Sequence, residues 1–255
     1  MIRKYNCFFE DIKKSVEKDE SFLIAYYGAS TTSQEYMFPN WGEIIRYTLK
    51  YAFENEDEGE DDYKKYMWNI HTINLGLDGA SSTDLLERFD NLVLSKKPNI
   101  IFLDASKNDV YYKIDKKVTE NNNKKLIKKA LDKGIKVVFT ARIPSLRENL
   151  NKKIIEYNEI DKKIAKEFSE NKNFIFIDLF NIFPKTLIKE SYTLIHPISN
   201  EYIGIKAGEI DPIHYNKLGN VIVSKILLKE VFNIDFDENK FLKDLSDNTK
   251  MFPDY

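Results

Sequence analysis

Short apolar runs alternate along the chain with longer segments in which apolar residues recur at helical spacing. The runs are rich in β-branched and aromatic residues and are bounded by turn residues, which is typical of buried strands. The pattern predicts five strands, over residues 21–28, 66–76, 98–106, 135–144 and 173–180.

Amphipathic segments separate these strands. Their apolar residues recur three and four positions apart, as a helix with one buried face requires. Helices are predicted over residues 5–19, 40–53, 81–94, 123–134, 149–170 and 216–232. The stretch 181–210 has no regular pattern, although we expect it to shape a pocket, and residues 236–255 resemble a polar tail.

The alternation of strands and helices predicts an α/β protein with a parallel sheet covered on both faces. No repeat, low-complexity linker or break in composition divides the chain. We therefore predict one domain over residues 1–255, with its core at about 20–232.

Composition narrows the classes of function. The 255 residues are 42% hydrophobic and 31% charged, and the formal net charge is −2. This balance is typical of a globular protein, and scattered lysines give no basic patch for nucleic acid. No apolar run approaches a membrane span, and the charged N-terminus does not resemble a signal peptide, so we expect a cytoplasmic protein.

Two local features are expected to have no catalytic role. Cys7 is the single cysteine, so neither an internal disulfide nor a paired-cysteine metal motif is possible. The acidic stretch 54–62 lacks the spacing of a calcium-binding loop and is interpreted as a solvated loop.

Polar residues and glycines follow the predicted strands where each strand ends. Ser30 follows the first strand, Gly79 the second and Asn108 the third, and Asp211 and His214 follow the long connection after the fifth. Ligands of open parallel sheets bind at the carboxyl ends of the strands. We therefore expect these residues to lie on one rim of the sheet.

Together these residues have the chemistry of acyl transfer. A serine hydroxyl needs an adjacent base, and His214 is suited to that role because imidazole titrates near neutral pH. Asp211, three residues earlier, would fix the ring tautomer. The Ser30 N–H, the Gly79 N–H and the Asn108 amide are the candidate donors to a developing oxyanion.

Four sequence blocks resemble those of the SGNH (GDSL-type) hydrolase family: YYGASTT, NLGLDGASSTDLLERFD, SKND and DPIHYNKLGN. The resemblance extends over roughly residues 20–232. It implies a flavodoxin-like three-layer α/β/α sandwich and ester hydrolysis with neither metal nor other cofactor. Two positions depart from the family pattern: Ala29 replaces the usual Asp of the first block, and Ser106 replaces the usual Gly of the third.

Structural roles remain open for the same residues. Ser30 could cap a helix, Gly79 could be a turn glycine, and Asn108 could belong to an Asx turn. His196 is the second candidate for the base and, together with Tyr27, Trp41, Tyr111 and Tyr112, a candidate pocket residue. Structural roles are expected for three other polar residues: His71 in a strand, Asp109 in a loop and Asp178 as a helix cap.

The sequence therefore predicts a serine esterase that acts on a small-molecule ester, such as a short-chain or O-acetyl ester on a carbohydrate. An acyltransferase that uses the same acyl-enzyme is one alternative, and a non-catalytic ligand-binding domain is another. The acyl chain length, the alcohol and the oligomeric state do not follow from the sequence.

Overall fold

The computed structural model describes residues 8–56, 68–201 and 204–249. Its centre is a five-stranded parallel sheet with the strand order β2-β1-β3-β4-β5. The strands are β1 (Phe22–Tyr27), β2 (Ile70–Asn74), β3 (Ile100–Asp104), β4 (Lys136–Thr140) and β5 (Phe174–Ile177). All four neighbouring pairs are parallel, so every strand presents its carboxyl end at the same edge. The strand order reverses beside β1, where such folds bind ligands.

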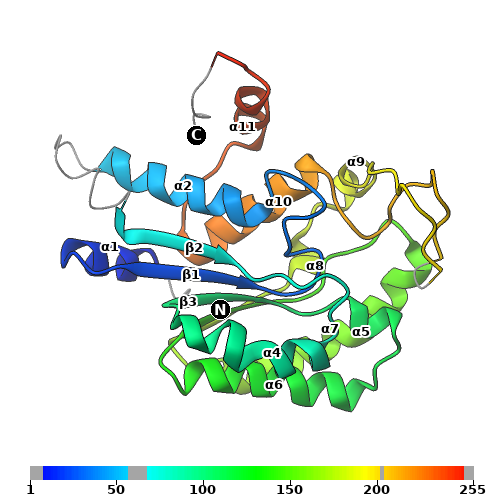
Figure 1. The fold of residues 1–255 in the computed structure, drawn as a ribbon, viewed down its shortest axis with the longest axis horizontal. Helices are drawn as coiled ribbons and strands as arrows, with labels where there is room; N and C mark the ends of the chain where they lie inside the picture. The colour runs from blue at the N-terminus through cyan, green and yellow to red at the C-terminus, as the bar shows by residue number, and fades with distance from the viewer. Residues whose placement is uncertain (1–7, 57–67, 202–203, 250–255) are drawn as a thin grey trace.

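Helices cover both faces of the sheet (Figure 1). One face is covered by α1 (Phe9–Glu17), α2 (Trp41–Glu56) and α10 (Lys217–Leu227), and α11 (Glu238–Leu245) packs against α10 on the same side. The other is covered by α4 (Ser82–Leu92), α6 (Lys116–Leu131) and α7 (Glu148–Phe168). The chain thus has the predicted three-layer α/β/α architecture.

Alternation along the strands divides the core into two clusters. In β3, Ile100 and Phe102 pack on the face below α2 and α10, whereas Ile101 and Leu103 pack on the α4 and α6 face. All four side chains are buried, which explains why the strand appears in the sequence as one continuous apolar run.

Shorter helical elements occupy the connections. These are α5 (Asn108–Tyr111), α8 (Leu179–Ile182), α9 (Ile188–Ser191), the 3₁₀ segments Leu94–Lys96 and Lys185–Leu187, and the π-helical turn Leu228–Phe232. The predicted irregular stretch 181–210 contains several of them. Its last part folds back on itself through antiparallel bridges from Ile195 to Ile210 and from Asn200 to Ile205.

Several predicted boundaries are wrong. The end of the predicted 173–180 strand, for example, is the first turn of α8. Helix α6 begins at Lys116, where Asp115 caps it through the Lys117 N–H, rather than at residue 123. Its first turns are polar, so hydrophobic spacing did not reveal them. The C-terminal segment is not merely polar, because it contains α11, whose Phe241 packs with Phe236 on the core.

Some predictions fall outside the described residues: Cys7, the first residues of the predicted 5–19 helix and 66–76 strand, and most of the acidic stretch 54–62. In the described part of the chain, no helix is both long and apolar enough to cross a membrane.

Candidate active site

Ser30 lies in a tight turn directly after β1. The turn is closed by hydrogen bonds from the Thr32 and Ser33 N–H groups to the Ala29 carbonyl, at 2.9 and 3.1 Å. The indole Nε1 of Trp41 donates to the Thr31 carbonyl at 3.0 Å and so ties the turn to α2. Ser30 is 9% exposed and lines a small cavity with His214.

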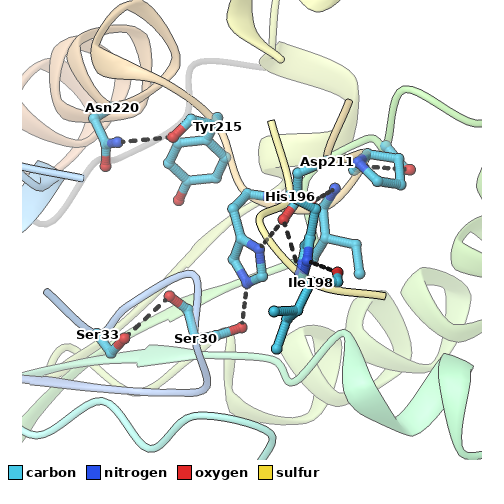
Figure 2. A network of polar contacts seen from close by, with 11 residues as sticks. Ser30, Ser33, His196, Ile198, Asp211, Tyr215 and Asn220 are labelled. Atoms are coloured by element: carbon cyan, nitrogen blue, oxygen red, sulfur yellow. Dashed lines mark hydrogen bonds and ion pairs between the residues drawn. The ribbon is translucent and has the colours of Figure 1, made fainter. Parts of the chain in front are cut away.

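His214 connects Ser30 to Asp211. The His214 Nε2 lies 2.8 Å from Ser30 Oγ, and its Nδ1 lies 2.7 Å from Asp211 Oδ2 (Figure 2). The second oxygen, Asp211 Oδ1, accepts the Ile213 and His214 backbone N–H groups at 2.7 and 3.0 Å. The structure thus brings together three predicted residues that are 184 and 3 positions apart in the sequence.

The turn that carries this pair is fixed from both sides. The Asp211 N–H donates to the Leu194 carbonyl at 2.7 Å, and Ser145 Oγ donates to the Pro212 carbonyl at 2.7 Å. Asn216 then caps α10 by accepting from the Gly219 N–H. The ring of His214 therefore sits on an anchored segment rather than on a free loop.

The environment of Asp211 favours its ionised form. Burial raises the pKa of this carboxyl. The hydrogen bond to the His214 ring, the charge of that ring when it is protonated, and the two backbone N–H groups together outweigh burial, so the pKa of Asp211 lies below its usual range. An ionised Asp211 accepts Nδ1–H, so the neutral ring presents an unprotonated Nε2 to Ser30.

Asn108 is held by the second sequence block. Its Nδ2 donates to the Ala80 carbonyl at 3.0 Å, which leaves the other amide hydrogen as a possible donor to a ligand. Ser106 supports this placement, because its Oγ donates to the same carbonyl at 2.6 Å and accepts the Asn108 N–H at 3.2 Å. The side chain that departs from the family pattern is therefore accommodated as an anchor of Asn108.

Gly79 adopts a left-handed backbone conformation, with φ of +72°. A Cβ atom here would meet only Tyr112 Oη, at 3.5 Å, so the backbone conformation rather than crowding favours glycine. Neither the Gly79 N–H nor the Ser30 N–H donates a hydrogen bond within the described ranges. Both are thus available to a ligand oxygen.

Tyr36 is a site residue that the sequence did not reveal. Its ring stacks on the His214 ring, with centroids 3.6 Å apart and planes 6° from parallel. Tyr36, Met37 and Asn40 line a small cavity of about 10 Å³ together with Ser30 and His214. Tyr36 lies in the 31–40 loop, which has no helical or strand periodicity, and nothing in the sequence relates it to His214.

A second feature absent from the sequence analysis is a buried charge cluster behind the site. Arg142 and Asp161 form an ion pair with no exposed side-chain surface, and Arg142 Nε donates to the Ser106 carbonyl at 2.8 Å. Asp104 accepts from Thr31 Oγ1 at 2.8 Å, and burial raises the pKa of its carboxyl.

Lys107 belongs to the same cluster and is 4% exposed. Burial lowers the pKa of its ammonium to about 8, although Asp104 and Asp211 act in the opposite direction. Lys107 Nζ and Arg142 Nη2 have no hydrogen-bond partner among the described residues, and both residues line a cavity of about 10 Å³. That volume is about the size needed for one ordered water molecule.

His196 lies beside Asp211 but is not bonded to Ser30 in the described structure. Its Nε2 is 4.0 Å from Asp211 Oδ2, and its Nδ1 is 2.5 Å from the Ile198 carbonyl (Figure 2). Because a carbonyl only accepts, Nδ1 carries the proton when the ring is neutral. His214 therefore has the geometry of a base toward Ser30, and His196 does not.

The predictions for the pocket aromatics are partly wrong. Tyr27 is fully buried, and its hydroxyl donates to the Leu85 carbonyl at 2.7 Å under α4. Trp41 belongs to the opposite core cluster, supports the Ser30 turn and lines the cavity that Lys107 and Arg142 also line. Tyr111 is partly buried, and burial, followed by the charge of Asp211, raises its pKa. Tyr112 is 45% exposed and lies beside Gly79.

The structural roles expected for two other polar residues are confirmed. Asp109 is buried and accepts the Ser82 N–H at 2.7 Å and the Thr119 hydroxyl at 2.6 Å, so it ties α4 and α6 to the Asn108 loop. Asp178 caps α8 through the Asn181 N–H. His71 lies in the edge strand β2, as expected. The described residues contain no group of three histidine, cysteine or acidic side chains arranged to hold a metal ion.

Comparison with known proteins identifies the family. The model of the GDSL-like lipase/acylhydrolase family matches residues 32–220. The chain belongs to this family. It is therefore a carboxylic ester hydrolase by family membership. The match begins just after Ser30, so the case for this serine depends on its contact with His214. A search of curated proteins found no match to the chain.

Several solved structures have a similar fold. The acetyl xylan esterase AlAXEase is 22% identical, with a TM-score of 0.61 over 82% of this chain and 100% of its own. The acetylxylan esterase Axe2 from Geobacillus stearothermophilus is 16% identical, with a TM-score of 0.62 over 87% and 98%. A lipase/acylhydrolase from Enterococcus faecalis is 14% identical, with a TM-score of 0.57 over 84% and 96%. At these identities the similarity establishes the fold alone.

Proposed function

We propose that this chain is a serine esterase that removes a short acyl group, such as acetyl, from a small-molecule ester. The observation that carries the proposal is the unbroken contact from Ser30 Oγ to His214 Nε2 and from His214 Nδ1 to Asp211. A serine hydroxyl next to a correctly oriented imidazole is the arrangement that nucleophilic acyl transfer requires.

In the proposed reaction, Ser30 Oγ attacks the ester carbonyl while His214 Nε2 takes the hydroxyl proton. The carbonyl oxygen becomes an oxyanion that accepts from the Ser30 N–H, the Gly79 N–H and the free Asn108 amide hydrogen. His214 returns the proton to the alcohol oxygen as the carbon–oxygen bond breaks. Water then enters, His214 deprotonates it, and hydrolysis of the acyl-enzyme releases the acid and restores Ser30.

The names of proteins with a similar fold favour a short acyl group. Two of the proteins of similar fold are acetyl xylan esterases by name, which makes acetylated carbohydrate a reasonable first substrate to assay.

The first experiment is intact-mass labelling with a fluorophosphonate probe. We expect one adduct on the wild-type protein, none on Ser30→Ala, and at least a hundredfold slower labelling of His214→Ala. His196→Ala is the matched control, because this second imidazole also lies near Asp211 but is not bonded to Ser30. It should be labelled at close to the wild-type rate.

Hydrolysis is then measured with nitrophenyl esters of increasing acyl length and with acetylated xylo-oligosaccharides. The proposal predicts the highest kcat/KM for acetate and a steep fall with chain length. Product formation that requires an added alcohol, and exceeds hydrolysis, would instead indicate an acyltransferase. A folded wild-type protein that neither reacts with the probe nor hydrolyses any ester contradicts the proposed function.

A further inference from the structure

Tyr36 stacks on the ring of His214, the proposed catalytic base. Its phenol ring lies almost parallel to the imidazole of His214, at 3.6 Å between centroids. With this degree of overlap, the phenol is also in van der Waals contact with Nε2, the atom that faces Ser30 Oγ. Tyr36 thus lies at the point where the proposed reaction exchanges its proton.

The geometry of the proposed reaction indicates which part of the substrate would contact Tyr36. The carbonyl oxygen is directed toward Gly79 and Asn108, and the alcohol oxygen must come within hydrogen-bonding distance of His214 Nε2. The first atoms of the alcohol therefore pass beside the phenol ring. The acyl group is attached to the same carbonyl carbon but extends in another direction.

The loop that carries Tyr36 is fixed at both ends and exposed at its tip. Ser33 Oγ donates to Asp78 at 2.5 Å, and the Asn40 amide donates to the Ser33 carbonyl at 3.0 Å. Tyr36 itself is 39% exposed although one face of its ring lies on His214. Tyr36 also lines the small cavity beside Ser30 and His214, so a ligand bound there can contact its ring.

We propose that Tyr36 is a specificity-determining residue that selects esters of ring-shaped alcohols by packing against the alcohol ring. Flat aromatic surfaces bind the faces and edges of other rings, at a gain that corresponds to about a tenfold change in affinity at most. Both a pyranose and an aryl alcohol present such a ring. This inference depends on the proposed esterase function and identifies the alcohol side of its substrate.

The test uses pairs of acetate esters in which the alcohols are of similar acidity but differ in shape. Benzyl acetate is compared with allyl acetate, and a mono-O-acetylated methyl xylopyranoside with glycerol monoacetate. The kcat/KM ratio within a pair removes any effect of Tyr36 on the basicity of His214, because both esters use the same base. The variants are Tyr36→Leu, which removes the ring, and Tyr36→Phe, which keeps it.

The wild-type enzyme and Tyr36→Phe are expected to prefer the ring ester in at least one pair. Tyr36→Leu should lower that preference about five- to tenfold, mainly through a higher KM for the ring ester. Loss of preference in the benzyl pair alone assigns the site to aryl alcohols, and loss in the sugar pair alone assigns it to pyranoses. The control is Trp68→Leu, since Trp68 is 68% exposed and precedes β2 at the opposite end of the sheet.

Some outcomes overturn the inference. An unchanged ratio in Tyr36→Leu, while all variants still hydrolyse the acyclic esters, refutes the role of Tyr36 and leaves the esterase function intact. An equal fall in kcat for both members of a pair means that Tyr36 only supports His214. If the folded wild-type protein hydrolyses none of the four esters and is not labelled at Ser30, both proposals fail.

Discussion

Asp211 binds His214 through both oxygens of its carboxylate. Oδ2 lies 2.7 Å from the ring Nδ1, and Oδ1 accepts the backbone N–H of His214 itself at 3.0 Å and that of Ile213 at 2.7 Å. The carboxylate therefore fixes the peptide and the side chain of the same residue. Because the two oxygens have separate partners, the effect of replacing one oxygen with an NH₂ group on the protonation of the His214 ring can be predicted.

Asp211→Asn should reverse the tautomer of His214. The two backbone N–H groups require an acceptor, so the Asn oxygen will take the Oδ1 position and its NH₂ group will face Nδ1. Nδ1 must then accept, the proton moves to Nε2, and the ring cannot take a proton from Ser30. We expect kcat to fall by roughly 10⁴-fold, as it does for the corresponding change in a serine protease.

Steady-state kinetics on an acetate ester measures the loss, and ¹⁵N NMR of the imidazole reads the tautomer directly. Asp178→Asn is the control, since Asp178 caps α8 through the Asn181 N–H and lies outside the chain of contacts from Ser30 to His214 and Asp211. Activity within tenfold of wild type for Asp211→Asn would contradict the proposed role of the carboxylate.

Asn108→Ala removes the proposed oxyanion donor with little effect on the fold, since Ser106 Oγ still donates to the Ala80 carbonyl. A lost oxyanion donor typically lowers kcat by about 10²- to 10³-fold while KM changes little. Ser106→Ala should cause a smaller loss, of roughly tenfold, because Asn108 keeps its bond to Ala80 but loses the acceptor of its N–H. Equal losses in the two variants would indicate that Asn108 positions the loop rather than the oxyanion.

The sequence was sufficient for the parts of the site that follow from topology. Ser30, Gly79 and Asn108 each come directly after a strand, and parallel strands place their carboxyl ends at one edge of the sheet. The pairing of Asp211 with His214 needed only their spacing. The sheet itself was predictable because strands such as β3 are buried on both faces and appear as apolar runs.

The missed features depend on contacts between distant segments. Tyr36 contacts His214 although most of the chain separates them in the sequence. Arg142 lies in a loop and pairs with Asp161 in a helix, and hydrophobic periodicity does not predict which polar side chains of two such segments come together. Tyr27 is one of the aromatic residues predicted to line a pocket, but its side chain is buried in the core. Its direction is set by the alternation along the strand, and it points beneath α4. The cytoplasmic location and the single domain stay predictions.

Arg142→Met should destabilise the protein strongly, because it leaves the fully buried carboxylate of Asp161 without its cation. Breaking one side of a buried pair typically costs about 3–5 kcal/mol, whereas replacing both partners with apolar residues is often close to neutral. The double variant Arg142→Met/Asp161→Leu should therefore be more stable than Arg142→Met alone. Urea denaturation gives the free energies of unfolding.

The exposed pair of Lys129 and Asp90 provides the matched control for the Arg142 and Asp161 variants. Their nitrogen and oxygen lie 2.6 Å apart, but the side chains are 41% and 59% exposed. Lys129→Met should change the free energy of unfolding by less than about 1 kcal/mol. If Lys129→Met and Arg142→Met had the same effect, burial would not determine the strength of these pairs.

The buried Lys107 makes the stability of the protein depend on pH. Its pKa is lowered from 10.5 in the unfolded chain to about 8 in the fold, mainly by burial. Between these values the unfolded lysine holds a proton that the folded one has lost, so this residue makes the wild-type protein more stable as pH rises through that window. Below pH 8 the folded protein must bury the charged ammonium, so the contribution of Lys107 to the free energy of unfolding is lowest there.

Lys107→Met removes this dependence. The variant should gain stability relative to wild type at pH 7, and the gain should shrink by about 3 kcal/mol as the pH rises from 8 to 10.5, from 1.36 kcal/mol per pKa unit. Urea denaturation of both proteins at pH 7, 8.5 and 10 measures the difference, in which the titration of other groups cancels. The exposed Lys129→Met is the control and should show a constant difference from wild type. A constant difference for Lys107→Met as well would mean that the folded Lys107 keeps an ordinary pKa, with its ammonium solvated by water in the adjoining cavity.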